Sequence, residues 1–150
     1  MPFNVKSTLE KVQSYLQASG HVVRAQISEP KQPPGERIMA AVYMGTVSVA
    51  QLTLQTTIEL HVVRVRLYMN MLREAGDEIE FGLAQALSEI SADLLGDYDL
   101  GATVRNVDVG GIYGTPLSAT WGYVDVGGTM YRVVDITLPL IVDDSATLVA

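Results

Sequence analysis

The sequence of 150 residues contains no cysteine, so neither a disulfide framework nor a thiolate metal site holds its fold together. Its apolar run at residues 138–142 is interrupted by a proline, and no apolar run approaches the roughly 20 residues that cross a bilayer. The first eleven residues lack the continuous apolar stretch of a secretory signal. We therefore expect a single domain over residues 1–150 that stays in the cytoplasm, has no membrane association and is stabilised by packing or by partner subunits.

Sequence motifs of catalysis and cofactor binding are also missing. There is no Gly-x-Ser-x-Gly nucleophile elbow, and the two histidines, His21 and His61, lack an acid at metal-ligand spacing. The segment Asp97–Gly101 begins like a calcium loop, but its glycine comes one place early and the usual final glutamate is absent. The glycines of residues 110–114 lack the spacing of a dinucleotide loop and indicate a flexible hinge. We predict no catalytic, cofactor-binding or metal-ligating residues, no cofactor, and a protein that is not an enzyme.

The formal net charge of −7 is divided unevenly along the chain. Residues 1–73 carry eight Lys and Arg against four Asp and Glu, a net +4, whereas residues 74–150 carry two against thirteen, a net −11. Because phosphate binding relies on clustered Lys and Arg, this balance argues against sequence-specific DNA binding. A solvated acidic face is the commoner meaning of such a distribution. The alternative is that the basic surface of one subunit or ring contacts the acidic surface of the next.

Periodicity and turn residues divide the chain into two helices and six strands. Apolar residues at helical spacing predict helices over residues 7–19 and 77–95, and Gly127–Gly128 predicts a tight hairpin. The expected fold class is α+β, with a mixed or antiparallel sheet, two helices packed on one face and the order α-β-β-β-α-β-β-β. The expected strands cover residues 21–28, 37–49, 56–68, 103–109, 119–126 and 129–138.

The ends of the predicted helices are marked by capping residues. Ser7 with Glu10, and Asp77 with Glu80, have the spacing of capping boxes, and Gly20 is a left-handed stop after the first helix. Two strand features are also expected. The apolar phase of strand 56–68 changes at Val62 and Val63, which predicts a β-bulge there, and Pro139 makes continued strand pairing improbable. The chain after about residue 143 is expected to form a flexible tail.

The order of the segments carries a resemblance to a known family. The opening helix ends in Ser19-Gly20 and is followed by a strand over residues 22–27 and by Glu29-Pro30-Lys31 of a proline-rich loop. Next come a strand that contains Ala40-Ala41-Val42-Tyr43, the long strand Glu59–Tyr68 and an acidic helix. The series ends with Tyr131–Ile136, which precedes a proline. In this order, and over most of its length, the sequence resembles the tail terminator family of long-tailed, siphovirus-type bacteriophages, particularly those that infect actinobacteria.

The resemblance implies a structural virion protein without an active site. Such a protein forms a ring, usually of six identical subunits, on the last ring of tail tube protein. It stops tube polymerisation and offers a docking face to the head-tail connector protein, thereby joining tail to head. Genomic DNA passes through the ring without sequence-specific binding. The expected location is the virion tail, assembled in the host cytoplasm.

Two sets of residues are candidates for these contacts. The polar side chains of the long strand are expected to project from its less buried face and, with the proline-rich loop, to lie at subunit boundaries: Glu29, Pro30, Lys31, Glu59, His61, Arg64 and Arg66. Acidic residues of the second helix are candidates for a lumen along which DNA slides: Glu78, Glu80, Glu89 and Asp93.

Two alternatives remain open at this point. The first is another ring of the same virion, either a head-completion or connector protein or the tail tube subunit, which needs a long polymerising hairpin. The second is a small α+β enzyme or ligand-binding domain with a pocket lined by Tyr43, Tyr68, Trp121 and Asp135. Trp121 is better explained as a core or interface anchor, because a lone aromatic residue in a strand usually packs.

Overall fold

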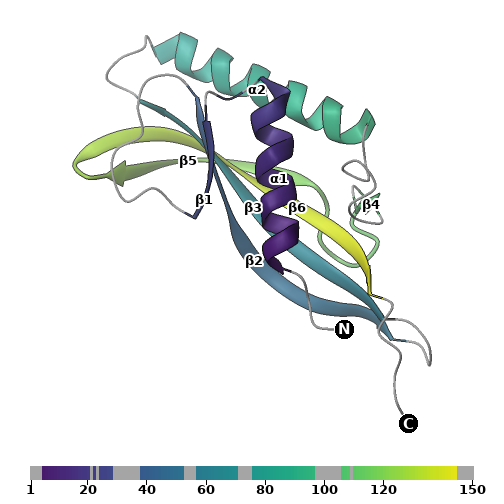
Figure 1. Ribbon diagram of the computed structural model, residues 1–150. Helices are drawn as coiled ribbons and strands as arrows, with labels where there is room; N and C mark the ends of the chain where they lie inside the picture. Colours follow the sequence, from purple (N-terminus) through teal and green to yellow (C-terminus); the bar gives the residue numbers. More distant parts are fainter. Residues whose placement is uncertain are drawn as a thin grey trace.

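Figure 1 shows the computed structural model, which confirms the α+β class and the expected element order. The structure describes residues 5–20, 22, 24–28, 38–52, 57–70, 76–96, 106–108 and 110–144. The helices are α1 (Val5–Ser19) and α2 (Gly76–Gly96), and the strands are β1 (Arg24–Ile27), β2 (Met39–Leu52), β3 (Thr57–Asn70), β4 (Asn106–Val107), β5 (Ser118–Val126) and β6 (Thr129–Asp144).

The six strands form one mixed sheet in the order β1-β2-β3-β6-β4, with β5 pairing β6 beside β4. β1 runs parallel to β2, and the other pairs are antiparallel. β3 is the central strand, because it pairs β6 along its whole length on one side and β2 from Thr57 to Tyr68 on the other. Gly127 and Gly128, both at positive φ, form the two-residue turn between β5 and β6 that the sequence predicts.

Both helices cover the same face of the sheet (Figure 1). Strand residues alternate between faces, so Val63, Val65 and Leu67 of β3 all point toward the helices, where they are at most 2% exposed. Helix α2 contributes Leu83 and Ile90 to this layer, likewise nearly fully buried. Each such side chain contributes about 2 kcal/mol through removal from water, so the helix–sheet layer is the main source of stability.

The observed helix ends differ in part from the expected ones. Helix α1 begins at Val5, which leaves Ser7 inside its first turn, so the predicted capping box with Glu10 is wrong. Gly20 has φ +79° and does end the helix in the left-handed conformation. In α2, Asp77 accepts a hydrogen bond from the neighbouring Glu78 amide, and the Glu80 carboxylate binds Arg132 instead of capping the helix.

The predicted bulge lies on β2 and not on β3. The β3–β6 register is continuous, whereas Met44 pairs Val63 and Thr46 pairs Val62, which leaves Gly45 as the extra residue. β3 keeps its regular pleat because it is paired with a strand on each side. Its apolar phase changes because Ile58, Leu60 and Val62 are buried on one face, and Val63, Val65 and Leu67 on the other. The bulge also explains the glycine: a Cβ at Gly45 would lie 3.1 Å from the carbonyl oxygen of Val62.

Pro139 does not end β6, contrary to the expectation from the sequence. The strand continues to Asp144, with Pro139 opposite Val62 of β3. The Pro139 carbonyl accepts a hydrogen bond from the Asp108 amide on the β4 side. Because the N and C=O of a strand residue point to the same side, the missing N–H also faces the gap between β5 and β4, and the β3–β6 ladder loses no bond.

Candidate interaction surfaces

The face of the sheet turned away from α1 and α2, here called the distal face, carries a polar centre. Directly paired residues share a face. One cross-strand row is therefore Tyr43, Arg64, Thr137 and Ser118, and the next is Ala41, Arg66, Asp135 and Thr120. Arg64, which is exposed, and Arg66, which is half-buried, both lie on this face, away from the helices. Their place at a subunit boundary stays a prediction.

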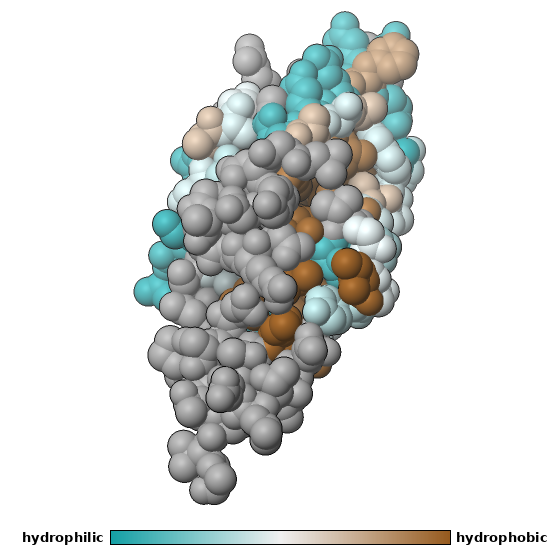
Figure 2. Space-filling model, turned by 90° about the vertical axis from the view of Figure 1, so that its right-hand side faces the viewer, coloured by the Kyte–Doolittle hydropathy of each residue, from teal (hydrophilic) through white to brown (hydrophobic). Residues whose placement is uncertain are grey.

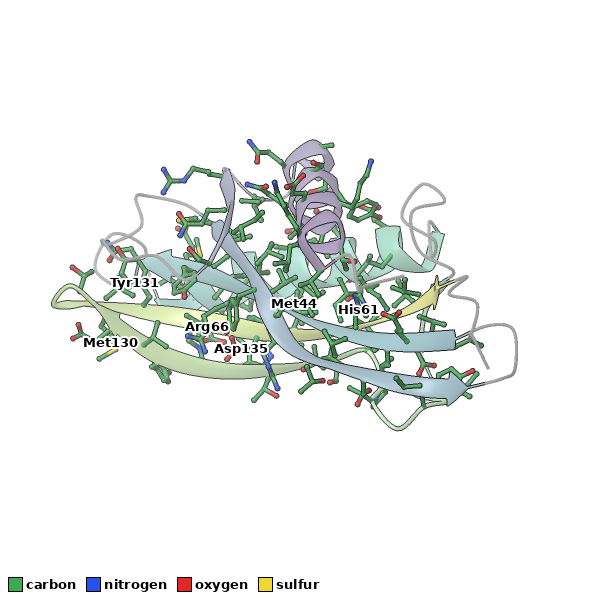
Figure 3. The ribbon with its side chains drawn as sticks, turned by 60° about the horizontal axis from the view of Figure 1, so that its bottom comes forward. Met44, His61, Arg66, Met130, Tyr131 and Asp135 are labelled. Carbon is green, nitrogen blue, oxygen red and sulfur yellow. The ribbon has the colours of Figure 1, made fainter. Side chains whose placement is uncertain are left out.

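An ion pair between neighbouring strands occupies the middle of the distal face. Nε and Nη2 of Arg66 donate to Oδ1 and Oδ2 of Asp135, the second at 3.2 Å. Figure 3 shows the two side chains together, on the side of the sheet opposite α1. Burial acts to lower the pKa of Arg66, but hydrogen bonds to Asp135 and Tyr68 outweigh it and raise the pKa above its ordinary value. Arg66 is thus satisfied within its own chain, and the surface cation left for external contacts in these rows is Arg64.

Aromatic residues continue the distal face beyond the ion pair. The Tyr68 and Tyr131 rings meet edge to face with centroids 6.1 Å apart, and both side chains are 1% exposed. The Arg66 guanidinium lies 6.0 Å from the Tyr68 ring centroid. Ala41 and Val133 complete this second buried cluster. The distal face therefore changes along the strands from an apolar, closed end to an exposed polar centre.

Glu59 and His61 lie on the opposite face, which corrects their expected placement. His61 Nε2 lies 2.9 Å from Glu59 Oε2, and His61 Nδ1 lies 3.3 Å from Thr8 Oγ1 of α1. Figure 3 places His61 between α1 and the sheet. His61 is 0%, Glu59 2% and Thr8 5% exposed, so these side chains cannot contact another subunit. Successive residues of a strand point to opposite faces, and the odd-numbered residues of β3 face the helices. The polar residues of this strand are therefore divided between the two faces and do not share one.

The Thr8, His61 and Glu59 groups have the order hydroxyl, imidazole and carboxylate, which resembles a nucleophile relay. A nucleophile must reach its substrate, and here the Thr8 hydroxyl is covered by the contact between α1 and the sheet. The network instead links the first helix to the central strand. Helix α1 gains a second polar contact at Gln13, whose side-chain amide donates to the Ala25 carbonyl of β1 at 3.1 Å.

Arg132 joins the β5–β6 hairpin to α2. Its Nε donates to Glu80 Oε1 at 2.7 Å, and its Nη1 donates to the Gly122 carbonyl at 3.2 Å. The guanidinium also lies over two aromatic rings, 4.3 Å from the centroid of Tyr123 and 5.4 Å from that of Trp121. Trp121 packs against the main core, as expected of an anchor. Sequence reasoning missed Arg132, although it is one of only two basic residues after residue 73.

Asp108 holds the glycine-rich loop before β5. Its carboxylate accepts hydrogen bonds from the amides of Ile112 at 2.9 Å and Tyr113 at 3.0 Å, and its carbonyl accepts one from Gly111. The Asp108 side chain is 2% exposed. The loop expected as a hinge is therefore anchored at its base. The usable signal was an aspartate two residues before a pair of glycines, which favours local side-chain-to-backbone bonds.

Of the predicted acidic residues of α2, Glu78, Glu89 and Asp93 lie along one side of the helix, here called the acidic stripe, whereas Glu80, two positions after Glu78, lies on the other side and faces Arg132. Glu78, Glu80 and Asp93 are exposed and Glu89 is half-buried, with Gln85 donating to Glu89 at 3.0 Å. Glu80 is partly neutralised by Arg132. Figure 2 shows hydrophilic residues predominating at the upper end of the molecule, which is the α2 end in Figure 1. Within the described residues, the acidic stripe of α2 and the polar centre of the distal face therefore lie on opposite sides of the sheet.

The structure does not bring the four proposed pocket residues together. Tyr43, Tyr68 and Asp135 lie on the distal face, whereas Trp121 pairs Val134 and points toward the helices. In the part of the chain that is described, no group of three His, Asp or Glu side chains is placed to hold a metal ion. Neither described helix is long and apolar enough to span a membrane.

Several predicted positions lie outside the described residues. They are Glu29, Pro30 and Lys31 of the proline-rich loop, His21, the calcium-like segment 97–101 and the tail after Asp144. Of the strand predicted over residues 103–109, the described portion that pairs is β4. Comparison of the sequence with protein-family models and with curated proteins finds no match.

Proposed function

We propose that this chain is a structural virion protein, the ring-forming tail terminator of a long-tailed phage. In this role about six copies close on the last ring of tail tube protein, end its growth and present a face to the head-tail connector. The resemblance in segment order suggests the family. One observation carries the proposal. Among the described residues, the ionisable side chains that could do chemistry are bonded to one another within the fold, and the remaining surfaces are extended and differ in charge.

Three sets of ionisable side chains each connect two elements of the fold. The buried Glu59–His61 pair ties α1 to the sheet, Arg66 and Asp135 join β3 to β6, and Arg132 joins the hairpin to α2. Outside these pairs the molecule offers an acidic helix side and a polar strand face. Such a division suits a subunit that meets different neighbours on different sides, because electrostatic complementarity selects partners and orientation.

The pairing of the β2–β3 hairpin favours a terminator over a tube subunit. A polymerising hairpin has to project from its subunit in order to reach the next ring. Here β3 pairs β6 over all fourteen of its residues, Thr57–Asn70, so the hairpin is part of the sheet. A protein built in this way is expected to form one closed ring and not a growing filament.

The acidic stripe of α2 is the surface that we assign to the DNA path. Glu78, Glu89 and Asp93 repel phosphate groups, so a lumen that they line lets DNA pass without adhering. The proposed partners are therefore further copies of the chain, the tail tube protein, the head-tail connector protein and transiting genomic DNA.

The test is the mass of the purified protein by light scattering across a series of protein and magnesium concentrations, with negative-stain images of each fraction. A discrete closed ring of about six subunits with a central hole is the expected result. Adding the ring to growing tail tubes is expected to stop their elongation. Filaments of the chain alone would indicate a tube subunit instead, and a monomer at every concentration that leaves tube growth unchanged contradicts the proposal.

A further inference from the structure

The two sides of the sheet end in strand edges that differ in composition and charge. On one side, β1 pairs only residues Met39–Val42 of β2. The outer edge of β2 continues over residues 43–52 without a partner strand among the described residues. On the other side, β5 pairs β6, and no described strand pairs its outer edge. Unpaired edges present rows of N–H and C=O groups that accept another strand.

The free edge of β2 lacks the charged residues and prolines that protect many exposed edges, although its register shifts between Met44 and Thr46 and between Val49 and Gln51. Its ten residues, 43–52, contain no Lys, Arg, Asp, Glu or Pro. Val49, near its far end, is 53% exposed although its side chain is apolar. An edge that met only water would normally carry inward charges or proline to prevent pairing. This composition therefore favours an edge that is covered in the working protein.

The charge on the two sides of the sheet is complementary. The described helix and strand beside the β2 edge, α1 and β1, carry the basic Lys6, Lys11 and Arg24 against the single acid Glu10. The elements on the other side, α2 and β5, carry six acids and no Lys or Arg. Three of these acids, Glu78, Glu89 and Asp93, belong to the stripe assigned to the DNA path. Those left for a lateral contact are Asp77, Asp125 and Glu80, the last of which is paired with Arg132. The uneven charge of the sequence thus becomes a difference between the two lateral sides of one sheet. A second copy of the same chain offers the opposite charge to each side.

Strand direction is also suited to a second copy. β2 runs opposite to β3, β3 opposite to β6, and β6 opposite to β5, so β2 and β5 run in opposite directions. Subunits related by rotation about a ring axis keep the sense of their strands. The β2 edge of one copy consequently meets the β5 edge of the next in the antiparallel sense, with no reversal of either subunit.

We propose that neighbouring copies join by antiparallel pairing of β2 residues 43–52 with β5 residues 118–126 of the next copy, forming one sheet that runs around the ring. This interface rests on the proposed function, because it specifies how that ring closes. The free part of β2 lies at the level of Thr57–Arg64 of β3, whereas β5 lies at the level of Arg64–Asn70. Each copy is therefore displaced along the strands relative to its neighbour, and the strands are inclined to the ring axis, as closed sheets require.

The absence of cysteine allows a direct test by disulfide cross-linking. Ser48 is exposed on the distal side of β2, and β5 offers five positions on the same side of the sheet. Five double variants combine S48C with S118C, T120C, G122C, V124C or V126C, so that each register that places Ser48 opposite β5 is covered. Under mild oxidation of the ring, at least one is expected to give a ladder of covalent multimers on a non-reducing gel. S48C combined with E78C, on the helix side, is the control and is expected to give no ladder.

A second experiment tests the β2 edge with a charged substitution and needs no cysteine. V49K places a charge on the exposed edge, and we expect the protein concentration at half-assembly to rise at least tenfold while the circular dichroism stays unchanged. I112K is the matched control, since Ile112 is an apolar residue 83% exposed in the loop before β5, and it is expected to assemble normally.

The outcomes separate the interface from the function. A wild-type ring in which none of the five pairs links, or which V49K leaves at the wild-type midpoint, overturns the interface and leaves the terminator proposal standing. A wild-type chain that never forms a ring and never stops tube growth overturns both.

Discussion

His61 Nε2 lies 2.9 Å from Glu59 Oε2 within a single strand, and both side chains are buried beneath α1. A charged or strongly polar pair in such a place is costly to break, because the partner left behind has no water to solvate it. The pair therefore makes the docking of α1 depend on polar as well as apolar contacts.

The first prediction concerns this pair. H61A leaves the Glu59 carboxylate buried without its imidazole partner, and we expect the free energy of unfolding to fall by about 3 kcal/mol or more. T8V removes one neutral hydrogen bond at the other end of the network and is expected to cost about 1 kcal/mol. Urea denaturation followed by circular dichroism measures both. Equal losses for the two variants would contradict the larger contribution assigned to the His61–Glu59 contact.

The second prediction concerns the ion pair on the distal face. In a double-mutant cycle with R66Q and D135N, we expect a coupling energy of about 1 kcal/mol, because the two side chains are 20% and 27% exposed and water screens part of their attraction. A cycle in which the two losses simply add would assign the pair no energetic role.

The same pair has a predicted pH dependence. The raised pKa of Arg66 means that the stabilisation is present below the unfolded-state pKa and is lost only as pH rises through the folded-state value. Both values lie above the working range, so the difference in unfolding free energy between wild type and R66Q should be the same at neutral pH and at about pH 8.5, below the usual range of tyrosine ionisation. Denaturation curves at the two pH values check this, and a shrinking difference at alkaline pH contradicts it.

The third prediction concerns the loop that Asp108 anchors. Gly111 has φ +70°, and a Cβ there would lie 2.8 Å from the Pro116 nitrogen, so G111A is expected to lower the melting temperature by several degrees through about 2 kcal/mol of strain. A Cβ at Gly110 would meet no atom within 4 Å, and its φ is not positive, so G110A is the control and should leave the melting temperature within about 1 °C. Calorimetry of the two variants distinguishes the local conformation from a general effect of glycine.

The fourth prediction concerns the acidic stripe of α2. The variant E78K/E89K/D93K leaves Glu80, the partner of Arg132, unchanged, so we expect it to fold and to form the ring. It should bind duplex DNA in a salt-dependent manner where the wild type does not, because clustered Lys residues bind phosphate. Fluorescence anisotropy with labelled DNA at low and moderate salt is the measurement. If the ring of this variant does not bind DNA, the acidic stripe does not line the DNA path.

Most of the fold was predictable from the sequence because local chemistry specified it. Helical spacing of apolar residues located both helices, and Gly20, Gly127 and Gly128 located turns, since each adopts a positive φ that other residues rarely reach. The alternation in the long strands gave the α+β class and the element order. Charge counts along the chain gave the division into a basic and an acidic half before any pairing was known.

The tertiary structure decided what periodicity could not express. Alternation says that neighbours in β3 point to opposite faces, but only the packing of α1 shows that Glu59 and His61 are on the covered face and Arg64 on the other. Pro139 is tolerated because its missing N–H faces a gap between two strands, which depends on where β4 and β5 stop. Pairings such as Arg66 with Asp135, 69 positions apart, arise from strand order. The sequence by itself therefore determined the elements and their charges, and the assembly of the sheet determined which side chains are buried, which are paired and which edges remain open.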